Sequence, residues 1–177
     1  MAMITRNELA PTEYGAFYAN YLAAVPGGHT VAEALRESGS LLQGYLSEVT
    51  PDREDFRYAP GKWTVKEALR HVIDTERVFA YRILRLGRRD PTPLPGFDQN
   101  VFAEAADVSR TAFADLRAEF DLVRRSTLEL VRSMGEEDLV FVGTASGYPL
   151  SCRAMAFIAA GHTYHHLTVY RERYAAG

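Results

Sequence analysis

Apolar residues recur at helical spacing in four long stretches of the chain, residues 30–49, 64–87, 109–134 and 151–177. In each stretch they fall three or four positions apart and polar residues fill the remaining positions. This pattern predicts amphipathic helices that each bury one face. A shorter aromatic stretch, residues 12–24, predicts one further helix near the N-terminus.

Residues typical of helix starts stand at the beginning of three of these stretches. Thr30 with Glu33, and Thr64 with Glu67, have the spacing of a capping box, in which two side chains satisfy free N–H groups of the first turn. Ser151 is a favourable N-cap residue. These positions predict where three of the helices begin.

Two connecting segments have patterns of their own. Residues 88–100 hold three prolines and no helical pattern, which predicts a long loop that crosses a bundle end or covers a pocket there. Residues 139–150 suggest a short β-hairpin around Ser146-Gly147. Because each apolar stripe needs a partner, the sequence predicts an all-α fold, a four-helix bundle with an extra short N-terminal helix.

Composition narrows the class of protein. The 177 residues are 47% hydrophobic and 24% charged, as in a globular protein, and we expect one domain over residues 1–177. The formal charge of -3 gives no reason to expect nucleic acid as a partner. No signal peptide and no apolar run of membrane-spanning length is visible, and Cys152 is the one cysteine. We therefore expect a cytoplasmic protein without a membrane partner.

Histidines gather in two of the predicted helices. His162 and His166 are four residues apart, so both side chains project from one helix face and could bind one ion. His165 competes for the second position, and a histidine-rich face without a metal is the plainer interpretation of this motif alone. His71, in the helix over residues 64–87, would complete a site of three nitrogens. Such a site suits zinc with an open position, and also nickel, cobalt or ferrous iron.

Glu76 lies in the middle of the apolar stripe of the same helix. A buried carboxylate is costly unless it is paired. It could assist a metal ligand, bind the metal or act as a general base. We favour a core ion pair with an arginine such as Arg153 or Arg171, and we predict that Glu76 is buried and hydrogen-bonded.

Two further features have a plain interpretation beside a functional one. Cys152 stands at the start of the last helix, where the thiol pKa could be lowered, but a small buried residue is favoured. Four arginines near the end of the helix over residues 64–87 could receive an anionic substrate. A solvated helix end beside the negative pole of its dipole is the favoured interpretation of this cluster. The four are Arg82, Arg85, Arg88 and Arg89.

Three segments together resemble the DinB/YfiT-like superfamily, particularly its DinB-like members: GKWTVKEALRHVIDTERVFAYRILRL, DPTPLPGFDQN and the closing GHTYHHLTVYRERY. The resemblance extends over residues 30–174. It implies an up-down-down-up four-helix bundle with a histidine-ligated metal near one end. The matching positions are His71, His162 and His166, which makes His165 a neighbour of the ligands.

The resemblance implies several activities. Some members of the family are metal-dependent transferases that use low-molecular-weight thiols, others are isomerases or metal-dependent hydrolases, some are linked to stress responses, and dimers are common. We therefore expect one divalent metal, zinc or nickel first, a small-molecule substrate and a homodimer. A thiol-dependent S-transferase acting on small electrophiles is the leading hypothesis. The alternatives are a hydrolase and a non-catalytic stress-response bundle.

Overall fold

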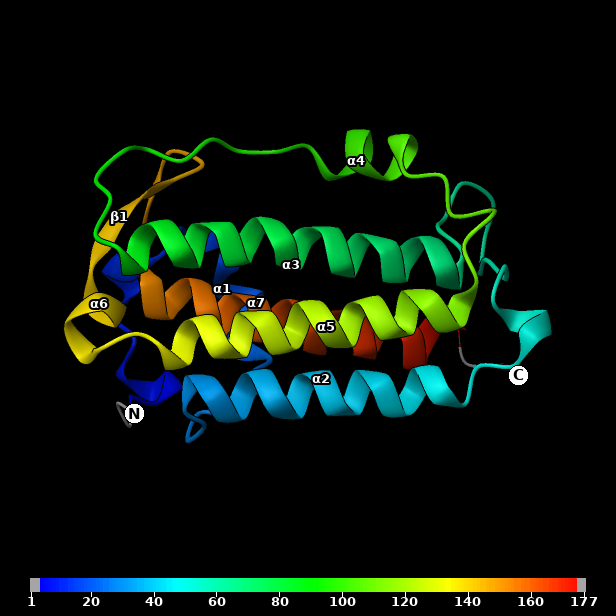
Figure 1. Ribbon diagram of the computed structural model, residues 1–177, viewed down its shortest axis with the longest axis horizontal. Coiled ribbons are helices and arrows are strands. Elements are labelled where there is room, and N and C mark those ends of the chain that lie inside the picture. Colours follow the sequence, from blue (N-terminus) through cyan, green and yellow to red (C-terminus); the bar gives the residue numbers. More distant parts are fainter. Residues whose placement is uncertain (1–3, 175–177) are drawn as a thin grey trace.

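Four long helices lie side by side in the computed structural model, which describes residues 4–174. They are α2 (Val31–Ser47), α3 (Val65–Gly87), α5 (Phe113–Arg132) and α7 (Cys152–Val169). Figure 1 shows α2 and α7 running in one direction and α3 and α5 in the other. Both α2 and α3 pack on α5 and α7. The predicted all-α bundle with up-down-down-up topology is confirmed.

Shorter elements precede, connect and follow the bundle helices. They are α1 (Ala19–Ala23), α4 (Gln99–Ala105), α6 (Glu136–Val140), β1 (Val142–Ala145), β2 (Tyr148–Ser151), a π-helical turn (Tyr170–Tyr174) and 3-10 turns at Arg6–Glu8, Pro11–Glu13, Ala16–Tyr18 and Pro51–Arg53. The predicted hairpin is present, with β1 and β2 antiparallel and Ala145 opposite Tyr148. Ser146 and Gly147 both have positive φ, 52° and 82°, as a two-residue hairpin turn requires.

Helix starts follow the capping residues of the sequence. The Thr30 N–H donates to Glu33 Oε2 at 2.8 Å, and the Thr64 N–H donates to Glu67 Oε2 at 2.6 Å. Ser151 Oγ accepts from the Ala154 N–H at 3.0 Å, so α7 begins where predicted. These side chains satisfy N–H groups that the first helical turn leaves free.

The connection between α3 and α5, residues 88–112, runs along the length of the bundle (Figure 1). The connection must take this path because α3 and α5 are parallel, so the chain has to return to the end of the bundle where α3 begins. The expectation that this loop crosses one bundle end is therefore wrong. Helix α4, which lies within the connection, was not predicted. Asp98 caps α4 by accepting from the Asn100 N–H at 2.8 Å. α5 begins at Phe113 rather than near Ser109, whose N–H is held by Asp107 in a turn.

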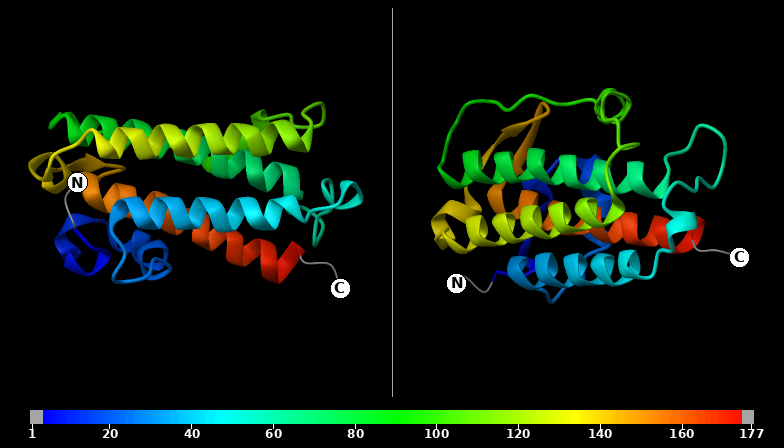
Figure 2. Two further views of the ribbon diagram at one scale, coloured as in Figure 1. Left: turned by 60° about the horizontal axis from the view of Figure 1, so that its bottom comes forward. Right: turned by 45° about the vertical axis from the view of Figure 1, so that its right-hand side comes forward.

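The N-terminal segment is less helical than expected, with α1 covering only five residues of the predicted range 12–24. Glu13 explains part of this difference, because its buried carboxylate accepts from Arg153 Nε at 2.7 Å and from Ser151 Oγ at 2.7 Å. These bonds draw the chain onto the start of α7 in place of a regular helix. Figure 2 shows this segment beside α7.

α7 is the central helix of the fold. Its residues from Ala154 to Thr163 are all buried, so it has no solvent face there, in contrast to the one-sided stripe that the sequence predicts. The physical reason is that α1, α2 and α3 pack around it, and small residues such as Ala156, Ala160 and Gly161 allow close approach. The predicted end of this helix, residues 175–177, lies outside the described residues.

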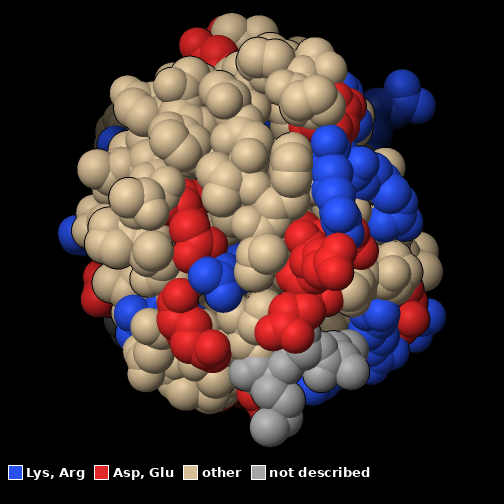
Figure 3. All heavy atoms as spheres, turned by 90° about the vertical axis from the view of Figure 1, so that its left-hand side faces the viewer, with Lys and Arg blue, Asp and Glu red and all other residues tan. Residues whose placement is uncertain are grey.

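No helix within residues 4–174 combines the length and apolar character needed to cross a bilayer. At the bundle end that carries α6 and the hairpin, acidic and basic side chains lie close together over part of the surface, and a wide area beside them is uncharged (Figure 3). This face has no continuous basic patch, in agreement with the formal charge of -3.

Candidate metal site

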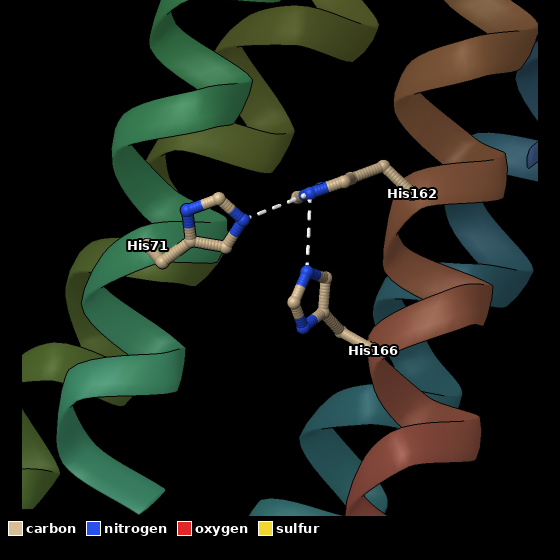
Figure 4. A group of neighbouring side chains, drawn as sticks. All are labelled: His71, His162 and His166. Atoms are coloured by element: carbon tan, nitrogen blue, oxygen red, sulfur yellow. Dashed lines mark hydrogen bonds between the residues drawn. The ribbon is translucent and has the colours of Figure 1, made fainter. Parts of the chain in front are cut away.

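Three histidine side chains meet inside the bundle, His71 from α3 and His162 and His166 from α7 (Figure 4). The Nε2 atom of His162 lies 3.2 Å from that of His71 and 3.1 Å from that of His166. All three residues are buried. The structure therefore brings together the three residues that the sequence predicted, and it places His165 outside the group.

The geometry fits one divalent ion. Four-coordinate zinc with Zn–N bonds of about 2.0–2.1 Å places neighbouring nitrogens roughly 3.3 Å apart. Hydrogen bonds alone explain this arrangement poorly. A neutral imidazole nitrogen either donates or accepts through one position, whereas His162 Nε2 faces two neighbouring nitrogens. Within the described residues, no fourth His, Cys, Asp or Glu joins the group. The donor set is therefore three nitrogens and leaves room for a further ligand.

Burial keeps these imidazoles neutral. It lowers the pKa of His71 to about 4 and the pKa values of His162 and His166 well below their usual value. Neighbouring histidines lower all three pKa values further. At neutral pH the nitrogen lone pairs are therefore free of protons, which is the state that binds a metal.

Surrounding side chains fix the imidazole rings. Trp63 stacks against His71 with ring centroids 4.6 Å apart, and Tyr21 meets His162 edge-on at 5.4 Å. The Thr75 hydroxyl oxygen lies 3.4 Å from His71 Nδ1, where it can accept a hydrogen bond from the Nδ1–H and leave the Nε2 lone pair free for the ion. Of these, Trp63 belonged to the motif seen in the sequence. Tyr21 and Thr75 were missed, although Thr75 stands one turn after His71.

A cavity of about 350 Å³ opens beside the histidines. Its walls come from α1, α3, α7, the π-helical turn after α7, the segment before α3 and the start of α4. They are formed by Tyr21, Tyr58, Gly61, Lys62, Trp63, Ala68, His71, Gln99, Asn100, His165, His166, Val169 and Tyr174. The loop over residues 88–100 was expected to cross a bundle end or cover a pocket there, and only its last two residues, Gln99 and Asn100, reach the cavity. The proline-rich part instead pairs with the hairpin, where the Leu94 N–H donates to the Thr144 carbonyl at 2.9 Å.

Comparison with known proteins identifies the family. The family model of the DinB superfamily matches residues 34–169. This match covers well over half of the chain and includes His71, His162 and His166. The chain belongs to the DinB superfamily. Among curated proteins, none matches the chain significantly.

A solved structure resembles this DinB-superfamily protein. YfiT from Bacillus subtilis, described as a probable metal-dependent hydrolase with an unusual four-helix bundle topology, aligns with a TM-score of 0.71. The alignment covers 80% of this chain and 82% of YfiT at 17% sequence identity. The likeness shows that the two proteins share a fold. The matched family range begins after α1, so Tyr21 belongs to a part of the chain outside it.

Glu76 is buried, as predicted, and it pairs with an arginine other than the two expected from the sequence. Arg124 on α5 donates to both Glu76 carboxylate oxygens at 2.7 Å. Its remaining N–H groups donate to the Leu35 carbonyl, Ser38 Oγ and Thr163 Oγ1 at 2.7–2.8 Å. The expected partners were wrong, since Arg153 binds Glu13 and Arg171 is exposed. Arg124 thus connects all four long helices, and its partner Thr163 directly follows His162 on α7.

The arginine cluster at the end of α3 divides into buried and exposed members. Arg82 is only 2% exposed, so a solvated helix end is the wrong interpretation for it. It donates to the Tyr18 hydroxyl at 3.1 Å, the Pro95 carbonyl at 2.8 Å and Ser146 Oγ at 2.9 Å. Arg82 therefore ties the long connection and the hairpin to α3. Arg89, in contrast, is half exposed and pairs with Glu137 at 2.9 Å.

Cys152 is fully buried, as favoured from the sequence, and burial raises the pKa of its thiol to about 12. We expect no reaction of the folded protein with iodoacetamide at pH 8, and full labelling in denaturant, because the reactive species is the thiolate. Mass spectrometry of the two samples measures this difference. Rapid labelling of the native protein would contradict the prediction.

Gly161 allows the N-terminal segment to reach the metal site. A Cβ added at Gly161 would clash with the Tyr21 carbonyl oxygen, so Gly161→Ala must push α1 away from α7. We expect destabilisation by about 1–3 kcal/mol and faster proteolysis of residues 4–28, measured by urea unfolding and limited digestion. Gly44→Ala is the matched control. It lies in α2 with open space around it, and should stabilise the fold slightly, since alanine is the better helix former.

Proposed function

We propose that this protein is a metal-dependent enzyme in which His71, His162 and His166 hold one divalent ion that activates a nucleophile for attack on a small molecule. One observation carries the proposal. The three converging nitrogens do not form a closed core site, because His71 and His166 also line a cavity of about 350 Å³. A metal that only joined two helices would need no such space.

A divalent ion at this site would supply Lewis acidity, lowering the pKa of a water or thiol that coordinates it. The protein's own residues would bind the small molecule and orient the three imidazole rings. Trp63 and Thr75 hold the His71 ring from two directions, and Tyr21 packs against His162. Tyr21, Tyr58, Trp63 and Tyr174 line part of the cavity, so aromatic rings are available to contact a bound organic molecule.

Transfer of a thiol to a small electrophile is the first candidate reaction. The cavity supports it, since 350 Å³ accommodates an organic thiol together with an acceptor, and aromatic walls make favourable contacts with sulfur. Hydrolysis is the second candidate, supported by the shared fold of YfiT, which is described as a probable metal-dependent hydrolase. The two differ in the attacking atom, sulfur or oxygen.

The experiment compares apoprotein with protein loaded with zinc, nickel or cobalt. Each is assayed with a panel of thiols and 1-chloro-2,4-dinitrobenzene, where a C–S bond forms, chloride leaves and the thiol proton passes to solvent. A parallel assay uses activated esters with water as the nucleophile. We expect metal-dependent turnover that disappears in His166→Ala.

The outcomes separate the candidates. Turnover only with a thiol supports the transferase, and ester cleavage without a thiol supports the hydrolase. A cobalt form whose visible spectrum is unchanged by thiols and by azide would show a closed coordination sphere. The non-catalytic metal-binding bundle would then be the correct interpretation.

A further inference from the structure

Lys62 is the one formally charged side chain among the described residues that line the cavity. No Asp or Glu is among the described residues that line it, whereas Lys62 stands at its edge. The remaining polar walls are neutral, with Gln99 and Asn100 from α4 and tyrosine hydroxyls. A divalent ion on the three histidines would add further positive charge. The electrostatic potential inside the cavity therefore favours an anion.

Lys62 is held in place by its backbone while its ammonium group is free. Its N–H donates to the Ala59 carbonyl at 3.2 Å across a turn with Pro60 and Gly61 at the centre. Gly61 has φ +74°, which a Pro-Gly type II turn requires. Within residues 4–174, no carboxylate forms a salt bridge with Lys62. This lysine can therefore pair with a ligand.

Trp63, the residue after Lys62, fixes the position of this segment of the chain. The Trp63 carbonyl accepts from the Tyr174 hydroxyl at 2.6 Å, and the Trp63 ring stacks on His71. The segment that carries Lys62 is thus fixed to His71 on α3 and to the π-helical turn that follows α7. Its position relative to the histidines is built into the fold.

A wider hollow of about 830 Å³ adjoins the cavity and shares Gly61, Lys62, Trp63 and Asn100 with it. Carboxylates do line this outer hollow, but most have partners in the protein. Glu67 accepts from the Thr64 N–H, and Asp107 accepts from the Ser109 N–H. Lys62 stands where the outer hollow meets the inner, acid-free cavity.

We propose that the organic ligand that enters the cavity carries a carboxylate or another oxyanion close to its metal-coordinating atom, and that Lys62 selects for this charge. The inference rests on the proposed function and names the class of its ligand. Lys62 acts as a specificity-determining residue, since it would contact the ligand at the cavity edge rather than the coordinating atom.

The test uses three thiols with the same two-carbon spacing: 3-mercaptopropionate is anionic, 2-mercaptoethanol is neutral and cysteamine is cationic. Each is titrated into cobalt-loaded wild type and Lys62→Gln, and the visible spectrum gives the dissociation constants. The intrinsic acidity of each thiol cancels in the ratio of variant to wild type. We expect Lys62→Gln to weaken 3-mercaptopropionate binding roughly three- to fivefold and to leave 2-mercaptoethanol unchanged.

Two control variants accompany this comparison. Lys62→Arg keeps the charge and should retain the preference for the anionic thiol. Arg125→Gln removes a positive charge from the exposed side of α5, outside the cavity, and should leave all three constants unchanged. Equal changes for the three thiols in Lys62→Gln, or no change for the anionic thiol, would overturn the inference.

A second measurement uses the metal-free protein, so that the carboxylate of the test ligand has no metal to coordinate. Calorimetry of wild type and Lys62→Gln with benzoate and with benzyl alcohol measures the charge preference directly. If thiols and azide leave the cobalt spectrum unchanged, the proposed function fails, while a Lys62-dependent preference for benzoate still supports the anionic ligand class. Absence of that preference overturns the ligand class whatever the cobalt spectrum shows.

Discussion

Replacing His162 with alanine should abolish metal binding, from about one ion per chain to none, because a three-nitrogen site loses one of its strong bonds. His162 is also the histidine whose Nε2 lies within 3.2 Å of both other Nε2 atoms, so its loss leaves two imidazoles without their common neighbour. Elemental analysis of protein purified after zinc or nickel loading measures the ion content.

His165→Ala is the matched control for this experiment. It removes a histidine from the same helix, beside His166, and this side chain is exposed and outside the converging group. The control should keep its metal. Unchanged metal content in all three single alanine variants, at His71, His162 and His166, would refute the site.

Glu76→Ala should destabilise the fold by about 3–5 kcal/mol, because it strands the buried guanidinium of Arg124. Arg124 is 4% exposed and Glu76 2% exposed, so water cannot replace the lost partner. Glu76→Gln should cost less, since an amide oxygen can still accept one hydrogen bond. Urea unfolding followed by circular dichroism measures the free energy of unfolding.

A surface ion pair of the same type provides the control for Glu76→Ala. Arg125 lies one residue after Arg124, with its side chain 68% exposed, and pairs with Asp121 one turn away. Asp121→Ala should change stability by no more than about 0.5 kcal/mol. Equal effects at Glu76 and Asp121 would contradict the role given to the buried network.

The long helices were predictable because their signals are local. Capping pairs such as Thr30 with Glu33 act within one turn, and a stripe of apolar residues marks the buried face of a helix whatever it packs against. The path of residues 88–112 was not predictable in this way. It depends on α3 and α5 being parallel, which is a property of the whole bundle.

The candidate site was predictable to the extent that histidine is rare in the chain. Five histidines leave few combinations, and helical spacing selects His162 and His166. The partner of Glu76 could not be found from spacing, because Arg124 lies 48 residues away on another helix. Tyr21 reaches the site only because Gly161 lacks a side chain, and this contact is visible only in three dimensions.

The central position of α7 affects how the chain is made. Among the described bundle helices α7 is synthesised last, yet α2 and α3 pack directly on it, and α5 packs on α2 and α3. The Glu13–Arg153 and His71–His162 contacts can form only after α7 has been synthesised, because they join residues 140 and 91 positions apart. A ribosome-bound chain that stops before α7 therefore exposes the apolar faces of α2 and α3, and at this stage of synthesis a chaperone would be needed most.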